Sequence, residues 1–286
     1  MGNRLQYINL LRLVATICVI FIHVGSLFIS SQGLQPQESS DYELYDFIHR
    51  FCAFAVPVFV LISGALLLNP SKEISYHKIF RKYIPRIVRA LLLFGLGMCL
   101  IEAYMTRAND NLIEIMVKSV ANLATGKCWT HMWYLYMLIG LYALVPLYKV
   151  FIKFADKKEL RWLVIVLAIM GVVLPYISKA GLLDIENYMT LPVFLFLLPC
   201  GYYIDVYLKK SKVSLVLSFV FLCVYAIYLL ISIKNGRPEY FGYDIITVMA
   251  AISVYHIGRF YSVEHSHFLE SLSKHCFCIY IIHAVI

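Results

Sequence analysis

The sequence has 286 residues, of which 61% are hydrophobic and 15% are charged, with a net charge of +8 and a mean hydropathy of +0.76. Soluble domains contain roughly 45–50% apolar and about 25% charged residues, and a soluble fold of this size lacks the polar side chains to cover so much apolar surface. The composition therefore excludes a soluble enzyme, a disordered chain and a disulfide-built secreted module, and it indicates a polytopic membrane protein.

Nine apolar stretches are candidate membrane spans, because a span needs about 20 mostly apolar residues. Lipid offers no partner to an unpaired backbone group, so each span is expected to be a helix. The predicted fold is therefore all-α, a polytopic transmembrane helix bundle. In chain order the predicted spans are 8–29, 48–68, 87–104, 131–151, 162–178, 190–208, 213–233, 244–261 and 275–286, of which the last is too short to cross.

The distribution of basic residues predicts the topology. With the N-terminus in the cytoplasm and alternating passes, most of the 25 Lys and Arg residues fall on the cytoplasmic side, as membrane proteins prefer. The amphipathic segment 109–126 is too polar to span, and we expect it along the outer interface or as a cap on the bundle. The eight cysteines lie mostly in apolar runs and are interpreted as small hydrophobic residues.

The first span contains two ionisable residues, Arg12 and His23. Eleven residues correspond to about three helical turns, so both side chains face one side of the helix, about 16 Å apart along its axis. A charge within lipid costs about 2.5–3.5 kcal/mol on insertion scales, which makes such residues functional candidates. Two structural alternatives stay open: Arg12 extends to the inner interface, and His23 bonds to a neighbouring helix.

A basic stretch opens the third span from the cytoplasm. Three of its cations, Lys82, Arg86 and Arg89, have the spacing of one helix face. Arginine forks match phosphate oxygens, so a phosphate-bearing ligand that arrives from the cytoplasm would suit this cluster. Ordinary enrichment of positive charge on the inner side explains the same stretch equally well.

Ser63 lies between Pro57 and Gly64 in the second span, where a bend or a close helix contact is expected. Its hydroxyl either satisfies a freed carbonyl or faces a ligand. His131 and Trp133 lie at the outer mouth of the fourth span, where Trp133 also fits an interfacial aromatic belt that would include Trp129.

The last span carries Tyr280 and His283 with the spacing of one helix face, and we expect His283 at a depth close to that of His23. His265 and His267 are expected to be solvated in the preceding loop. No metal site is predicted, because the sequence contains neither H-E-x-x-H nor a Cys/His ligand spacing.

Five motifs in chain order resemble those of the acyltransferase family 3 membrane proteins, which move acyl groups onto extracytoplasmic acceptors. The motifs are Arg12 with ten residues to His23, the run Pro57, Phe59, Ser63 and Gly64, the basic stretch Lys82 to Arg89, His131-x-Trp133 with the later Pro146, and Tyr280-x-x-His283. The closest similarity is to O-acetyltransferases of surface glycans. The family has ten spans, so the resemblance implies a single integral-membrane acyltransferase domain over residues 1–286 that lacks its final helix.

The resemblance implies the substrates and the site. The donor would be acyl-CoA, most often acetyl-CoA, reached from the cytoplasm, and the acceptor would be a hydroxyl of a glycan or lipid-linked sugar beyond a bacterial cytoplasmic membrane, without a metal or a tightly bound cofactor. His23 would act as general base or carry the acyl group briefly, and Arg12 is the second catalytic candidate, which would also face the donor phosphates. Donor phosphates would bind Lys82, Arg86 and Arg89, and substrate would contact Ser63, His131, Trp133, Tyr280 and His283.

The sequence is compatible with two other classes of function. A transporter or exporter shares the apolar helices and the midplane histidine, but the sequence shows no inverted repeat in its hydropathy and no acidic residue deep in a span. A membrane protein that only binds partners would leave Arg12 and His23 unexplained.

Overall fold

The structure is a computed structural model that describes residues 2–32, 40–72, 74–106, 111–127, 130–235, 243–261 and 265–283. These residues form helices and no strand. Seven of their helical segments are long and apolar enough to cross a membrane, namely Gln6–Ser26, Asp41–Leu67, Tyr76–Tyr104, Trp133–Phe154, Lys157–Lys179, Asn187–Tyr207 and Lys212–Lys234. They correspond to the first seven predicted spans, and the predicted all-α polytopic fold is confirmed.

The last two predicted spans correspond to shorter helices. Helix α13 (Ile245–Phe260) matches the eighth predicted span. Helix α14 (His267–Ile282) begins at His267 rather than at 275, because its first turns are amphipathic and bury Leu269 and Ser273. Residues 284–286 of the ninth prediction lie outside the described residues.

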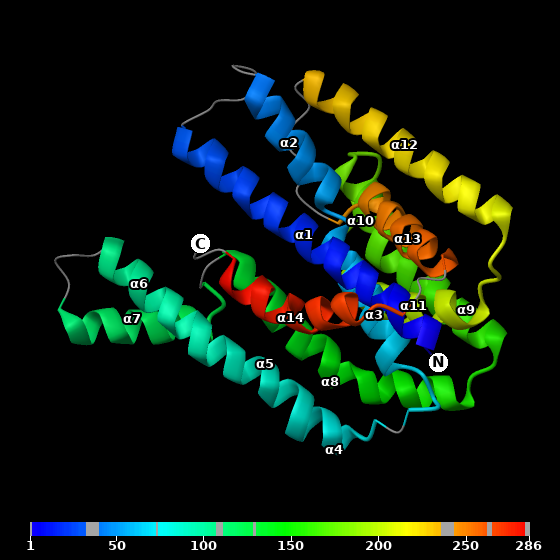
Figure 1. Ribbon diagram of the computed structural model, residues 1–286, viewed down its shortest axis with the longest axis horizontal. Helices are drawn as coiled ribbons and strands as arrows, with labels where there is room; N and C mark the ends of the chain where they lie inside the picture. The colour runs from blue at the N-terminus through cyan, green and yellow to red at the C-terminus, as the bar shows by residue number, and fades with distance from the viewer. Residues whose placement is uncertain are drawn as a thin grey trace. The chain divides into compact units, whose positions relative to one another are not determined.

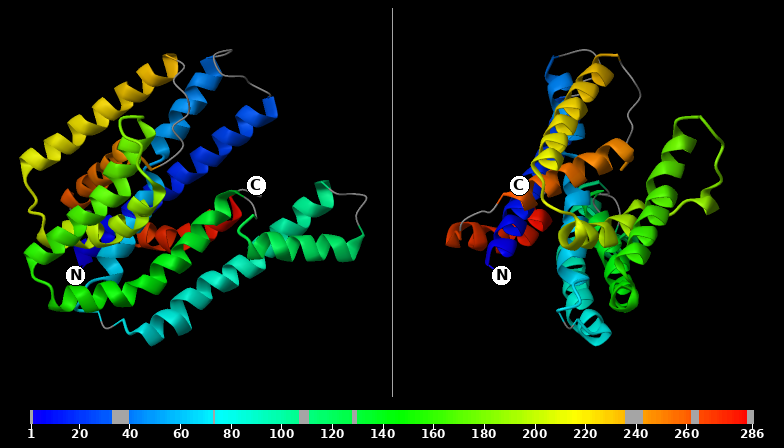
Figure 2. Two further views of the ribbon diagram at one scale, coloured as in Figure 1. Left: turned by 180° about the vertical axis from the view of Figure 1, so that it is seen from behind. Right: turned by 90° about the vertical axis from the view of Figure 1, so that its right-hand side faces the viewer.

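The chain divides into two compact units, Met1–Asn69 with Phe154–Tyr280, and Pro70–Lys153 with Ile281–Ile286. The first unit contains α1 (Gly2–Gln32), α2 (Ser40–Cys52), α3 (Ala55–Leu67), α9 (Lys157–Ala168), α10 (Leu174–Lys179), α11 (Val193–Tyr207), α12 (Lys212–Lys234), α13 and most of α14. Within it, α3 packs against α1, α11 and α13, while α2 lies between α1 and α12 (Figures 1 and 2).

A break separates α2 from α3 within the second span. The turn at residues 53–54 precedes α3, and Pro57 lies in the first turn of that helix. A proline is tolerated there because the first N–H groups of a helix have no intrahelical partner. The bend that Pro57 predicts is therefore present as a change from one helix to the next.

Gly64 of α3 and Gly201 of α11 allow the backbones of the two helices to touch. A Cβ atom on Gly64 would collide with the carbonyl of Leu198, and one on Gly201 would collide with the carbonyl of Leu61. Small residues at helix crossings permit this close approach in membrane proteins. The close contact expected at Gly64 is confirmed, with Gly201 as its counterpart.

The second unit begins with one long helical segment. It comprises α4 (Tyr76–Lys78), α5 (Ile84–Ala90) and α6 (Leu96–Thr106), joined by π-helical turns at Ile79–Tyr83 and Leu91–Gly95. Pro85 has no N–H and its ring would clash in a regular helix, and the wider turn just before it accommodates this. The helix thus starts well before the predicted span at 87, and the basic stretch is helical.

Helix α7 (Leu112–Ala124) packs back against α6, as Figure 1 shows at the end of the long segment. Asn111 caps it by accepting a hydrogen bond from the N–H of Glu114. Ile115, Ser119 and Leu123 form its buried face, so the predicted amphipathic helix is present. The Pro70–Lys153 part of the unit closes with a 3-10 turn, Thr130–Met132, and with α8 (Trp133–Phe154), whose last residue belongs to the first unit.

Candidate functional site

Arg12 and His23 lie on one uninterrupted helix, α1, so their predicted spacing of three turns holds. Both side chains are partly buried. Thr16 and Val19, which lie between them on the same side of the helix, are only 2% and 3% exposed. The stripe that joins Arg12 to His23 therefore faces protein.

The opposite side of α1 is apolar and exposed. Its large exposed side chains are Val14, Ile17, Phe21 and Val24, as expected of a surface that meets lipid. Thr16 donates a hydrogen bond of 2.8 Å to the carbonyl of Arg12, so the buried hydroxyl is satisfied within α1. The first helix thus separates a lipid-facing side from a side with two ionisable groups.

Ser63 uses its hydroxyl within its own helix. The hydroxyl donates a hydrogen bond of 2.9 Å to the carbonyl of Phe59, and the side chain is partly buried next to the crossing at Gly64. Of the two predicted roles for Ser63, the structure shows the bond to a carbonyl.

Tyr280 is buried on the face of α14 that also buries Ser273 and Cys276. Ser273 donates a hydrogen bond of 2.8 Å to Oδ1 of Asn9. This bond between two buried side chains joins α14 to the beginning of α1. Tyr280 therefore belongs to the packing face of α14 within the first unit.

A buried polar cluster in the first unit was not predicted. Tyr7 donates a hydrogen bond of 2.5 Å to Oδ1 of Asp205, and its hydroxyl oxygen lies 3.4 Å from that of Tyr255. Arg259 places Nε 3.8 Å from the same Asp205 oxygen. The four residues come from α1, α11 and α13, and they join three helices by polar contacts in the interior of the unit.

Arg259 lies within the eighth predicted span, in the last turn of α13, and is 7% exposed. Its Nη2 donates hydrogen bonds to the carbonyls of Asp205 and Leu208, at 3.0 and 2.8 Å. These carbonyls end α11, where a cation is favourable. The only sequence signals for this arrangement are Asp205 and Arg259 near the ends of two apolar spans.

The three predicted phosphate ligands lie in the second unit. Lys82 is in the π-helical turn, and Arg86 and Arg89 are in α5; all three side chains are exposed. Nε of Arg89 donates a hydrogen bond of 3.2 Å to the carbonyl of Pro85. The three cations are therefore accessible on one helical segment.

His131 lies against His283 in the second unit. The two imidazole rings have centroids 5.3 Å apart and meet edge to face at 68°. His131 is 2% exposed, and burial together with the neighbouring His283 lowers its pKa to about 4. His131 is thus neutral near pH 7, and one of its ring nitrogens can donate a hydrogen bond while the other accepts one.

His283 contacts His131, a residue with which the sequence did not predict a contact. His283 lies in a turn directly after Ile282, the last residue of α14, three residues beyond Tyr280. Trp133 is 37% exposed and stacks edge-on against Tyr134, with ring centroids 6.3 Å apart. Trp129, the other expected member of the aromatic belt, lies outside the described residues.

The structure therefore places Arg12 and His23 on one side of α1, three turns apart, and it brings His131 into contact with His283. Comparison with known proteins adds one finding. The family model described as "Acyltransferase domain" (Acyl_transf_3) matches residues 5–286. No curated protein and no solved structure matches the chain. With a match over nearly its whole length, the chain belongs to the Acyl_transf_3 family and is a multi-pass membrane acyltransferase.

Proposed function

We propose that the protein is an O-acyltransferase that moves an acyl group, most often acetyl, from cytoplasmic acyl-CoA to a hydroxyl of a glycan or lipid-linked sugar across a bacterial cytoplasmic membrane. The observation that carries the proposal is the protein-facing stripe of α1 from Arg12 to His23, with Thr16 and Val19 buried between them. Ionisable residues within a membrane helix cost free energy of insertion, and they therefore mark functional sites.

His23 is the proposed general base, because an imidazole exchanges protons near neutral pH. It takes the proton of the acceptor hydroxyl as the oxygen attacks the thioester carbonyl. The carbon–oxygen bond forms, the carbon–sulfur bond breaks, and the imidazolium returns the proton to the departing coenzyme A thiolate. The products are the ester and free coenzyme A, and His23 ends in its starting state.

Arg12 and the cations of the second unit are the proposed contacts of the donor. Arg12 lies about 16 Å from His23 along α1, a length comparable with the arm that joins the phosphates of coenzyme A to its thioester. Lys82, Arg86 and Arg89 are exposed on a segment whose start the topology prediction places in the cytoplasm. Arginine pairs well with phosphate.

The acceptor is proposed to contact His131, Trp133, Ser63, Tyr280 and His283. In support, the neutral imidazole of His131 both donates and accepts hydrogen bonds, as recognition of sugar hydroxyls requires. The partly exposed indole of Trp133 offers an apolar surface to a sugar ring.

The test is acyl transfer by purified protein in nanodiscs, with radiolabelled acetyl-CoA and a panel of lipid-linked sugars. His23→Ala is expected to lower kcat by roughly 10²–10⁴-fold, the usual contribution of a general base. His275→Ala is the matched control, because His275 is an exposed histidine of α14. Transfer by His23→Ala at the rate of the control would refute the role of His23.

Two further readouts separate the alternatives. Intact mass after incubation with acetyl-CoA but no acceptor distinguishes a transiently acylated His23 from a general base, because only the former gains one acetyl group. Sugar flux into sealed vesicles without consumption of acetyl-CoA would favour a transporter. The buried carboxylates do not favour that rival, since Asp46 pairs with Arg50 at 2.8 Å and Asp205 with Tyr7.

A further inference from the structure

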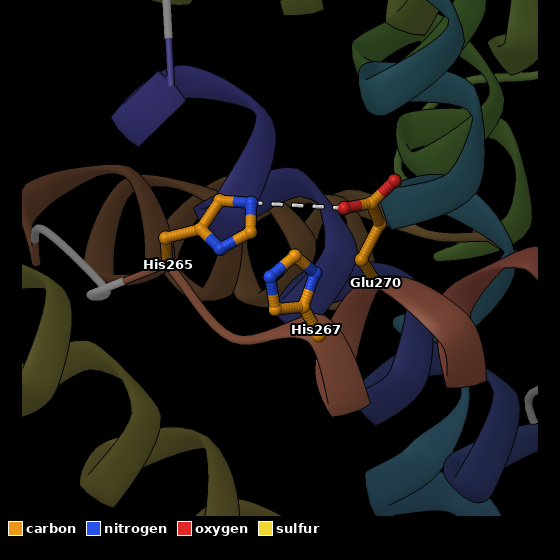
Figure 3. Close-up of side chains that lie close together, drawn as sticks. All are labelled: His265, His267 and Glu270. Atoms are coloured by element: carbon orange, nitrogen blue, oxygen red, sulfur yellow. Dashed lines mark ion pairs between the residues drawn. The ribbon is translucent and has the colours of Figure 1, made fainter.

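Three potential metal ligands gather where α14 begins. The side-chain ligand atoms of His265, His267 and Glu270 all lie within 4.8 Å of one another. Nε2 of His265 is 3.7 Å from Oε2 of Glu270, and the two imidazole rings have centroids 4.6 Å apart. Figure 3 shows the two rings and the carboxylate facing a common space. None of the three has a part in the proposed acyl transfer.

The start of the helix sets this arrangement. Ser266 lies between the two histidines and caps α14: its hydroxyl accepts a hydrogen bond from the N–H of Leu269, and its carbonyl accepts one from the N–H of Glu270. His267 and Glu270 are three residues apart on the helix, so their side chains emerge on the same side. These two bonds fix the backbone from Ser266 into the first turn of α14.

A fourth residue orients the carboxylate. Nζ of Lys274 lies 2.8 Å from Oε1 of Glu270, one helical turn away. This ion pair occupies one oxygen of the carboxylate and leaves Oε2 toward His265. Partners that hold a ligand from behind are a regular feature of metal sites.

We propose that His265, His267 and Glu270 bind a divalent transition-metal ion, zinc by the chemistry of the donor set. Two imidazole nitrogens and one carboxylate oxygen are a set that zinc accepts with a fourth position open to water, whereas calcium and magnesium prefer oxygen ligands alone. Zinc bonds of about 2.0–2.2 Å require the ligands to move closer together. The side chains are 53% exposed for His265 and 38% for Glu270, so both have room to change rotamer.

Binding would join His265, which precedes α14, to the first turn of the helix. The next turn carries Ser273, whose bond to Asn9 joins α14 to α1. The ion would therefore cross-link the start of α14, the helix that ends near His283. This role is structural and lies outside the proposed chemistry of acyl transfer.

The first experiment is a titration of the purified full chain, carrying a tag without histidines, with Co²⁺ followed by visible absorption and with Zn²⁺ followed by calorimetry. One equivalent is expected to bind. His267→Ala and Glu270→Gln are expected to weaken binding by at least roughly 10–100-fold, the cost known for weaker perturbations of metal sites. His275→Ala, eight residues further along α14, is the matched control and is expected to bind as the unaltered chain does. Equal binding by His267→Ala and the control would overturn the proposal.

A second experiment uses the unaltered chain and does not depend on the folding of a variant. Histidines are labelled with diethylpyrocarbonate with and without Zn²⁺, and the labelled sites are read by mass spectrometry. Zn²⁺ is expected to protect His265 and His267 while the exposed His275 reacts as before. Unchanged labelling of His265 and His267 at saturating Zn²⁺ would contradict the assignment.

Discussion

The hydroxyl of Tyr7 donates a 2.5 Å hydrogen bond to Asp205, a residue 198 positions later in the chain. The bond joins the beginning of α1 to the end of α11, and Asp205 also lies beside Arg259 of α13. Because all these groups are buried, each polar atom that loses its partner pays the cost of desolvation. The contact therefore links the helix that carries Arg12 and His23 to the core of the first unit.

Tyr7→Phe is expected to lower the free energy of unfolding by about 1.5–3 kcal/mol, the range for a hydrogen bond to a charged group. Thermal unfolding in detergent, followed by intrinsic fluorescence, measures the loss. Tyr228→Phe is the control, since Tyr228 is an exposed tyrosine of α12. Equal melting temperatures for the two variants would show that the bond contributes nothing.

Gly64→Ala and Gly201→Ala are expected to destabilise the first unit by about 1–3 kcal/mol or more, as overpacking does. In each case the new methyl group meets a backbone carbonyl, which cannot rotate away as a flexible side chain can. Gly140→Ala in α8 is the control, because the space around Gly140 is open. A melting temperature of Gly64→Ala as high as that of the control would rule out the tight crossing.

The stability of the protein is expected to fall between pH 6.5 and pH 4 because of His131. Burial lowers the pKa of His131 to about 4 in the folded state, whereas an unfolded histidine titrates near about 6.5. Below pH 6.5 His131 binds a proton in the unfolded chain but not in the folded chain, so the free energy of unfolding falls with the pH. The stability that depends on a neutral His131 is complete above pH 6.5 and is lost as the pH falls to 4. Its full size is about 3 kcal/mol at 1.36 kcal/mol per pKa unit.

His131→Gln removes this pH-dependent contribution. Denaturant unfolding of the unaltered chain and of His131→Gln across this range is expected to give curves whose difference shrinks toward acid pH. His275→Gln is the control, because His275 is exposed. A difference between the unaltered chain and His131→Gln that stays constant with pH would exclude a depressed pKa for His131.

Neutralising Lys82, Arg86 and Arg89 to Gln is expected to raise KM for acetyl-CoA by about tenfold or more, because one charged hydrogen bond contributes about 1.5–3 kcal/mol. The KM for S-acetyl-N-acetylcysteamine, a thioester without phosphates, is expected to stay unchanged. Lys212→Gln, at the exposed start of α12, controls for a general loss of positive charge. An equal rise in KM for both thioesters would argue against a phosphate contact.

The sequence was sufficient for the features that lipid imposes. Long apolar runs predict spans, because the bilayer core allows backbone groups only internal partners, and the spacing of Arg12 and His23 predicts one helix side once α1 is continuous. Pro57 and Gly64 likewise predicted a bend and a crossing, since each changes what the backbone itself can do.

The features that were missed depend on distant residues or on amphipathic ends of helices. Nothing near Tyr7 in the chain indicates that it meets Asp205, because contacts across 198 positions follow from tertiary packing alone. The contacts of Arg259 were missed because a cation at the end of an apolar run has the same pattern whether it is solvated or caps a neighbouring helix. The cluster of His265 and Glu270 was missed because the polar first turns of α14 were assigned to a loop.

The crossing of α3 and α11 has a consequence for motion. Where main-chain atoms of two helices touch directly, neither helix can slide past the other without driving a carbonyl into a side chain. When substrate binds or product leaves, α3 and α11 are therefore expected to move as one rigid body. Ser63 on α3 and Asp205 on α11 would keep their relative positions during that motion.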